Sequence, residues 1–168
     1  NKWLNFYTGI GNTCANLFKR QAVLDINGWD ESLKSGQEPD LMFRMYQHNA
    51  SIAFDPAVNT FIRVQENGIT GSDQVGNYKR YSAFIFRVFE YLTSSSLIAQ
   101  NENQMVYSKV FDTVRTLYRL DRAAGRAAFH KYLLGKKNLA KTESKVYNML
   151  FQILGFETTE KSFMVLGK

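Results

Sequence analysis

Residues 27–44 read NGWDESLKSGQEPDLMFR, and this segment restricts the fold more than any other because a proline lies at a predicted helix start. Pro39 has a fixed φ and no amide hydrogen, so a helix accepts it in the first turn and no further in. If Pro39 is the first helical residue, Glu38 lies at the cap and Asp40 one position inside. If Ser35 and Glu38 form a capping box instead, Pro39 still lies in the first turn. Both registers predict two carboxylates at a helix N-terminus, beside a loop.

Two carboxylates at a helix start need no catalytic function to explain them. The helix dipole favours each acid there by about 0.3–1 kcal/mol. A structural role is therefore the first explanation of Glu38 and Asp40, and a catalytic role needs support from the surrounding sequence.

The N-terminal part of the chain alternates predicted strands with predicted helices. Short runs of apolar and polar residues suggest strands at 3–7, 15–19, 51–55 and 60–65. Helical spacing is predicted at 20–26 and 38–48, the second helix burying Leu41, Met42 and Met45. Helices among strands indicate the α/β class, seen as α+β in this chain.

Residues 71–168 have helical periodicity throughout. A long amphipathic helix is predicted at 74–93 from the spacing of Tyr78, Tyr81, Ile85, Val88 and Leu92. A second apolar stripe consists of Val106, Tyr107, Val110, Phe111, Val114, Leu117 and Tyr118. A third helix is predicted at 121–134, and a fourth follows a cap at Thr142 and ends at Gly155. We expect a bundle of about four helices, then an apolar tail at 163–166.

Composition excludes several classes of protein. The chain has 168 residues, of which 45% are hydrophobic and 14% aromatic, enough for a real core. Cys14 is the only cysteine and His48 and His130 are the only histidines, so neither an internal disulfide nor a His/Cys metal cluster is expected. No apolar run is long enough to span a bilayer, and no signal peptide is recognisable. Because the chain begins with Asn1 rather than Met, we expect a fragment or a processed piece.

Positive charge is concentrated in the C-terminal part. Residues 1–100 carry nine basic and nine acidic side chains, whereas residues 101–168 carry twelve basic and six acidic ones. If the helices around them were continuous, one face would carry Arg115, Arg119, Arg122 and Arg126. Such a face would suit an anionic membrane surface, or less specifically nucleic acid. The alternative is that these arginines pair with Asp112, Asp121 and the loops.

The motifs in residues 11–70 resemble the second half of the catalytic domain of family 2 glycosyltransferases, which have the GT-A fold. The matching pieces follow in the family's order: a predicted strand and helix at 16–24, the turn NGWDE at 27–31, the acidic motif QEPDL at 37–41, Arg44, and FIRVQ at 61–65. The resemblance implies a GT-A-type sheet domain at 1–70 and a helical C-terminal region at 71–168.

The resemblance also implies roles for individual residues. Inverting sugar transfer needs a base for the acceptor hydroxyl, and the family's motif places Glu38 in that role, with Asp40 holding the loop or orienting Arg44. If the register slips, Asp40 becomes the base. The residues implied to bind substrate are Asn16, Trp29, Asp30 and Arg63.

Mg²⁺ or Mn²⁺ is the cofactor that the resemblance implies, because the diphosphate leaving group needs its charge neutralised. Gln65 stands where a metal-contacting histidine is common, and an amide oxygen is a weak substitute. The Asp-x-Asp metal motif of the donor-binding half occurs nowhere in the chain. We therefore expect no strongly bound metal here.

The sequence thus predicts a glycosyltransferase segment without its donor-binding half, inactive alone. Its partners would be a nucleotide-sugar donor and a saccharide or lipid-linked acceptor, as in polysaccharide biosynthesis. The expected location is the cytoplasm, at the inner face of a membrane. The rival hypotheses are a non-catalytic helical interaction module and a basic domain that binds nucleic acid or a membrane surface.

Overall fold

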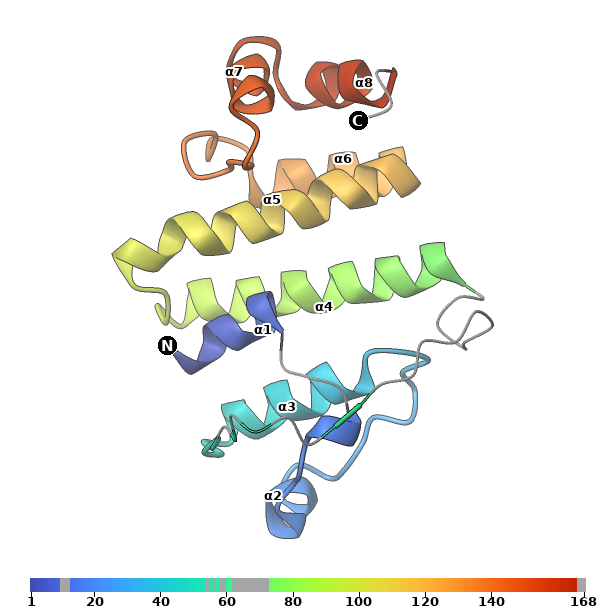
Figure 1. Cartoon of the computed structure of the whole chain (residues 1–168), viewed down its shortest axis with the longest axis vertical. Helices are drawn as coiled ribbons and strands as arrows, with labels where there is room; N and C mark the ends of the chain where they lie inside the picture. Colours follow the sequence, from blue (N-terminus) through green and yellow to red (C-terminus); the bar gives the residue numbers. More distant parts are fainter. Residues whose placement is uncertain (10–12, 54, 56, 58–59, 62–72, 166–168) are drawn as a thin grey trace. The chain divides into compact units, whose positions relative to one another are not determined.

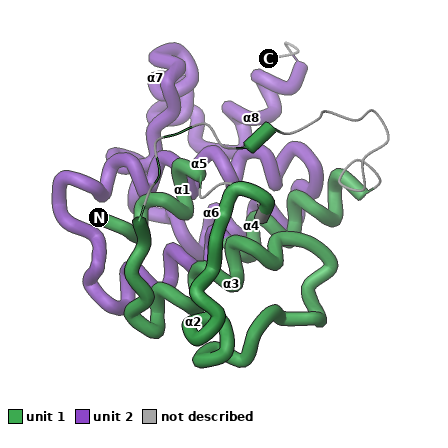
Figure 2. Tube along the Cα trace, turned by 60° about the horizontal axis from the view of Figure 1, so that its bottom comes forward, with its two compact units in different colours: residues 1–84 green, residues 85–168 purple. Residues whose placement is uncertain are grey.

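The chain is described here by a computed structural model that covers residues 1–9, 13–53, 55, 57, 60–61 and 73–165. It divides into two compact units, Asn1–Phe84 and Ile85–Lys168 (Figure 2). The division falls within one long helix. The boundary predicted between residues 70 and 71 lies at residues outside this description and stays a prediction.

The regular structure of the described residues is helical. Figure 1 labels the α-helices in chain order. The N-terminal elements are the 3₁₀ turn η1 (Lys2–Leu4), α1 (Asn5–Thr8), the 3₁₀ turn η2 (Thr13–Ala15), α2 (Arg20–Leu24) and α3 (Gln37–Gln47). The later elements are α4 (Gln74–Ser94), the 3₁₀ turn η4 (Gln100–Glu102), α5 (Asn103–Leu120), α6 (Arg122–Tyr132), α7 (Lys145–Leu154) and α8 (Phe156–Val165).

The predicted α/β class is therefore wrong, and the protein is all-α over the described residues, without a GT-A-type sheet. A strand needs a neighbouring strand to pair its backbone groups. No such ladder forms at 3–7, at 15–19 or at the described positions of 51–55. Residues 62–65 of the last predicted strand lie outside the described part of the chain.

The aromatic run at 3–7 shows why the strand prediction failed. Trp3, Phe6 and Tyr7 are buried, and their i, i+3, i+4 spacing is that of a helix face. Asn1 supports the helical start because its side-chain Oδ1 accepts a hydrogen bond from the backbone nitrogen of Trp3 at 3.2 Å. Leu17, in the second predicted strand, is fully exposed instead of facing a core.

The core of unit 1 is built from aromatic side chains. Phe6 makes edge-on contacts with Phe43, Tyr46 and Phe84, with ring centroids 5.5, 5.2 and 5.8 Å apart. Trp3 adds a contact with Tyr46 at 5.5 Å. These contacts join α1 and η1 to α3 and to the first part of α4.

The helices of unit 2 largely follow the predicted periodicity. Six of the seven positions of the second apolar stripe are buried on α5, namely Val106, Val110, Phe111, Val114, Leu117 and Tyr118. The third helix is capped by Asp121, and Ser144 rather than Thr142 caps α7. Residues 163–165 of the predicted apolar tail are instead the end of a further helix, α8, and residue 166 lies outside the described part of the chain.

The core of unit 2 lies among α5, α6, α7 and α8. Phe129 and Phe156 are stacked with centroids 4.3 Å apart and planes at 2°. Phe111 contacts Phe151 at 4.9 Å, and Tyr118 meets Phe156 edge-on at 5.1 Å. Aromatic pairs of this geometry add about 0.5–1.5 kcal/mol each beyond area burial.

Candidate functional site

The predicted site centres on the start of α3, and its local geometry follows from Gly36. This residue has φ +77° and caps the helix in the left-handed conformation, which glycine adopts without strain. Pro39 is then the third helical residue, within the first turn as expected, although neither predicted register holds. Its missing amide hydrogen costs nothing there, because the first amide groups of a helix have no partner within it. Gln37 Nε2 donates to the carbonyl of Leu33 at 2.7 Å and closes the turn.

Asp40 is buried, with 2% of its surface exposed, and is paired with Arg44 one turn later. Arg44 Nε donates to Asp40 Oδ2 at 2.8 Å, and a second guanidinium nitrogen donates to the carbonyl of Ile26, also at 2.8 Å. Ile26 follows α2, so this relay joins the turn after α2 to the start of α3. Asp40 is thus bonded to Arg44, and the role that the resemblance implies for it stays a prediction.

Three of the predicted substrate residues, Asn16, Trp29 and Asp30, lie in the segment before α3. The Trp29 ring is partly exposed and meets Phe18 edge-on with centroids 6.1 Å apart. Asp30 Oδ1 accepts hydrogen bonds from the backbone nitrogen and hydroxyl of Ser32, at 2.9 and 2.6 Å. Asn16 is half-buried, and so is Glu38, which lies in the first turn of α3. Arg63 and Gln65 lie outside the described residues, so their predicted roles stay predictions.

Arg80 in α4 holds the loop before α3, and sequence reasoning missed it. Its Nε donates to Ser35 Oγ at 2.7 Å, and another nitrogen bonds Asn77 Oδ1 at 2.6 Å and Asp73 Oδ2 at 3.0 Å. The hydrogen bond to Arg80 also lowers the pKa of the Asp73 carboxyl. Arg80 and Ser35 are 45 positions apart, and a local sequence pattern cannot predict a contact over that separation. The Asp40–Arg44 pair is predictable, because residues four apart on a helix are neighbours.

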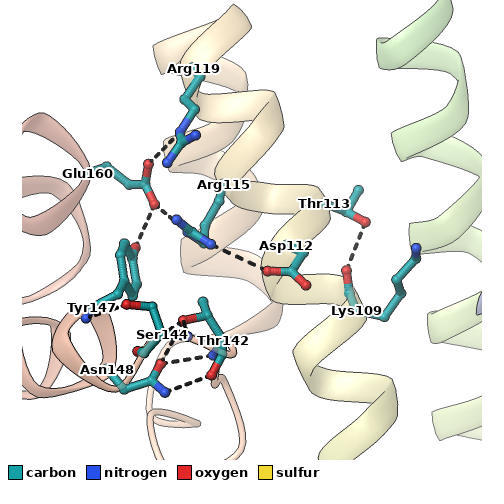
Figure 3. Close-up of polar contacts among 10 residues, drawn as sticks. All are labelled: Lys109, Asp112, Thr113, Arg115, Arg119, Thr142, Ser144, Tyr147, Asn148 and Glu160. Atoms are coloured by element: carbon teal, nitrogen blue, oxygen red, sulfur yellow. Dashed lines mark hydrogen bonds and ion pairs between the residues drawn. The ribbon is translucent and has the colours of Figure 1, made fainter. Parts of the chain in front are cut away.

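A second polar cluster, also missed, surrounds Glu160 of α8 (Figure 3). Glu160 is completely buried. Its carboxylate accepts hydrogen bonds from Arg115 Nε at 2.5 Å, Arg119 Nε at 3.0 Å and the Tyr147 hydroxyl at 2.6 Å. We call these four residues the Glu160 cluster; it joins α8 to α5 and α7.

The environment of the Glu160 cluster shifts the pKa values of two members. Burial, with a smaller effect from the Glu160 hydrogen bond and charge, raises the pKa of the Tyr147 phenol. Burial alone would lower the pKa of Arg115, but the Glu160 hydrogen bond and charge outweigh it and raise the pKa. Two guanidinium groups and a phenol donate hydrogen bonds to the buried carboxylate, so we interpret the Glu160 cluster as structural.

Most arginines of the predicted arginine face form ion pairs within unit 2. Arg115 and Arg119 bind Glu160, and Arg126 binds Glu157 Oε2 at 2.6 Å. Arg115 also approaches Asp112 at 3.5 Å, whereas Asp121 serves as the cap of α6. The expected pairing with acids is therefore present, but its main partners are the two glutamates of α8.

The described residues do not assemble a divalent-metal site. Among them, no three side chains of histidine, cysteine, aspartate or glutamate lie in a group that could hold an ion. The expected Mg²⁺ or Mn²⁺ therefore has no fitting donor set in this part of the chain. The described helices also include none that is both long and apolar enough to cross a membrane.

Comparison with known proteins adds no relative: no family model, no curated protein and no solved structure matches the chain. The glycosyltransferase resemblance therefore depends on the motifs at 16–65 themselves.

Proposed function

We propose that this chain is the acceptor-side segment of an inverting glycosyltransferase, which moves a sugar from a nucleotide-sugar donor to an acceptor hydroxyl. The observation that supports it is the contrast between the two acids at the start of α3. Asp40 is only 2% exposed, whereas the side chain of Glu38, two residues earlier, is half-buried. The proposal concerns the activity and the motif, and does not include a sheet.

Glu38 is the base in this proposal. Its carboxylate takes the proton of the acceptor hydroxyl while the hydroxyl oxygen forms a bond to the anomeric carbon. The bond from that carbon to the donor phosphate breaks, and its electron pair leaves with the nucleoside diphosphate. Attack opposite the leaving group inverts the anomeric centre.

Asp40, Arg44 and Arg80 act as positioning residues. Arg44 links Asp40 to the carbonyl of Ile26, and Arg80 holds Ser35 in the loop before the helix. These contacts hold the start of α3 to the turn after α2 and to α4, so the position of Glu38 relative to the acceptor would be fixed. Such fixed geometry is worth several kcal/mol in a transfer reaction.

Glu38→Gln tests the base in the enzyme of which we propose this chain is a segment. We expect kcat for sugar transfer to fall about 10²–10⁴-fold, because the amide cannot accept the proton. Calorimetry should show unchanged donor binding. Glu31→Gln makes the same chemical change at an exposed position of the preceding turn and should leave kcat unchanged. A Glu38→Gln variant that keeps more than about a tenth of the rate would contradict the assignment.

Asp40→Asn separates the positioning role from the base. Loss of the charged hydrogen bond to Arg44 should lower the free energy of unfolding by about 1–3 kcal/mol, measured by urea titration. A panel of uridine, guanosine and thymidine diphosphate sugars, assayed with saccharide acceptors and the enzyme of which we propose this chain is a segment, tests the activity as a whole. No transfer from any donor would overturn the proposed function.

A further inference from the structure

Helix α7 is apolar on two sides, and only one side faces the core of unit 2. Tyr147 and Phe151 are completely buried. Val146, Met149 and Ile153 are 59%, 56% and 72% exposed. Their spacing by three and four residues places them in one strip along the helix. An apolar strip of this kind on a helix is normally covered, and none of the described contacts of unit 2 buries it.

A basic segment borders this strip. Thr142 and Asn148 exchange hydrogen bonds of 2.8 Å, from Thr142 N to Asn148 Oδ1 and from Asn148 Nδ2 to the Thr142 carbonyl (Figure 3). Gln152 Nε2 donates to the carbonyl of Lys137 at 3.2 Å. Asn148 and Gln152 lie on the strip of α7 next to the apolar one, together with Lys145. The segment 136–144 therefore runs along one edge of the apolar strip.

The lysines of this border are available to a partner. Residues 136–154 contain four lysines and one acid, Glu143. Lys136, Lys141 and Lys145 are exposed, and the contacts described for them include no ion pair. We define the α7 face as these three lysines with Val146, Met149 and Ile153.

We propose that the α7 face docks on an anionic lipid bilayer, with α7 lying in the plane of the interface. The three apolar side chains would enter the boundary of headgroups and acyl chains, and the lysines would contact lipid phosphates. This inference is independent of the proposed sugar transfer. It also differs from the arginine face predicted from the sequence, whose members are mostly bound to glutamates.

Charge and chemistry favour lipid over the other partners of such a surface. Nucleic acid would gain from aromatic or arginine stacking platforms, and the exposed strip has neither. A second copy seated on the same strip would bring its own lysine border against this one, and like charges oppose that pairing. A bilayer with anionic lipid satisfies the apolar and the basic parts together.

Vesicle co-sedimentation of the 168-residue chain tests the proposal, with phosphatidylcholine vesicles that contain or lack phosphatidylserine. We expect binding only to the anionic vesicles, weakening as salt rises from about 50 to about 500 mM. Lys141→Gln with Lys145→Gln should weaken binding roughly 25-fold, since each lysine near such a surface contributes about fivefold. The matched control neutralises two exposed lysines of unit 1, Lys19→Gln with Lys34→Gln, and should change binding far less.

The apolar strip has its own pair of variants. The control for Met149→Glu with Ile153→Glu is Val75→Glu with Leu120→Glu, which adds the same charge at other exposed apolar sites. The α7 variant should weaken vesicle binding more than tenfold further than this control does. Circular dichroism should show unchanged helix content in both, because all four positions are exposed.

Three results would overturn the proposal. The first is no binding to anionic vesicles at low salt, and the second is an equal loss in the α7 and control variants. The third is self-association, seen by sedimentation velocity, that Met149→Glu with Ile153→Glu abolishes, because a second copy would then occupy the strip.

Discussion

Two carboxylates are almost completely buried in the described part of the chain, and arginine holds each of them. Asp40 is bonded to Arg44 within α3, and Glu160 is bonded to Arg115 and Arg119 of α5. An acid without partners at such a depth would cost several kcal/mol, so these pairs decide whether the surrounding helices can pack. At the scale of single residues, Glu160 is therefore a sensitive position of unit 2.

Glu160→Gln should lower the free energy of unfolding by about 3–5 kcal/mol, because it leaves two arginines beside a neutral amide in a buried site. Chemical denaturation followed by circular dichroism measures the change. Glu143→Gln alters an exposed glutamate of the same unit and should stay within about 0.5 kcal/mol of the parent. A loss below about 1 kcal/mol for Glu160→Gln would show that the cluster does not hold α8.

At the scale of elements, the pair formed by α5 and α6 depends on one close approach. Asp121 alone separates the two helices, and its side chain caps α6 by accepting from the backbone nitrogen of Ala124 at 3.0 Å. The helices then lie side by side. A Cβ atom at Gly125 would overlap the backbone of Tyr118, so only glycine permits this packing.

Gly125→Ala should therefore destabilise unit 2 by about 1–3 kcal/mol, the usual cost of overpacking. The sign is informative, because in an isolated helix the same change stabilises by roughly 0.8–1 kcal/mol. The exposed position Ala127 provides the control: Ala127→Gly should cost about 1 kcal/mol through helix propensity alone. Thermal unfolding of the three proteins makes the comparison, and a stabilised Gly125→Ala variant would contradict the close packing.

At the scale of the whole molecule, each unit buries a tyrosine whose phenol must stay neutral. Burial raises the pKa of Tyr7 in unit 1, and burial with the Glu160 hydrogen bond raises that of Tyr147 in unit 2. Unfolded tyrosine titrates near pH 10, so only the unfolded state loses these protons just above that value. The stabilising contribution is complete below about pH 10 and falls above it, by up to about 1.4 kcal/mol per pH unit for each tyrosine.

Tyr7→Phe isolates this effect, because the buried Tyr7 hydroxyl has no hydrogen-bond partner in the described structure. We expect the variant to be as stable as the parent, or more so, at pH 7. Between about pH 10 and 11, urea titrations should show a shallower loss of stability than in the parent. Equal slopes for the two proteins would rule out a buried, neutral Tyr7.

Local patterns in the sequence determined much of the helical part. The spacing of apolar residues identified α3 to α7, because this signal lies within a few residues along the chain, although the caps of α3 and α7 differ from those predicted. The Asp40–Arg44 pair belongs to the same class, since four residues along a helix bring two side chains together. The proposed activity likewise follows from the order of the motifs at 16–65, which is a property of the sequence and requires no knowledge of tertiary contacts.

Tertiary structure alone decided the fold class and the partners of the buried charges. A five-residue run such as 3–7 fits a strand or a helix equally, and the neighbours that bury Trp3, Phe6 and Tyr7 choose the helix. Helix α8 escaped notice because its buried face includes Thr159 and Glu160 beside Phe156. Apolar periodicity cannot identify such a face, because two of its three buried residues are polar or charged. The charge of Glu160 can be buried there because Arg115 and Arg119, more than forty residues away in the sequence, bind it. No local sequence pattern predicts such a contact.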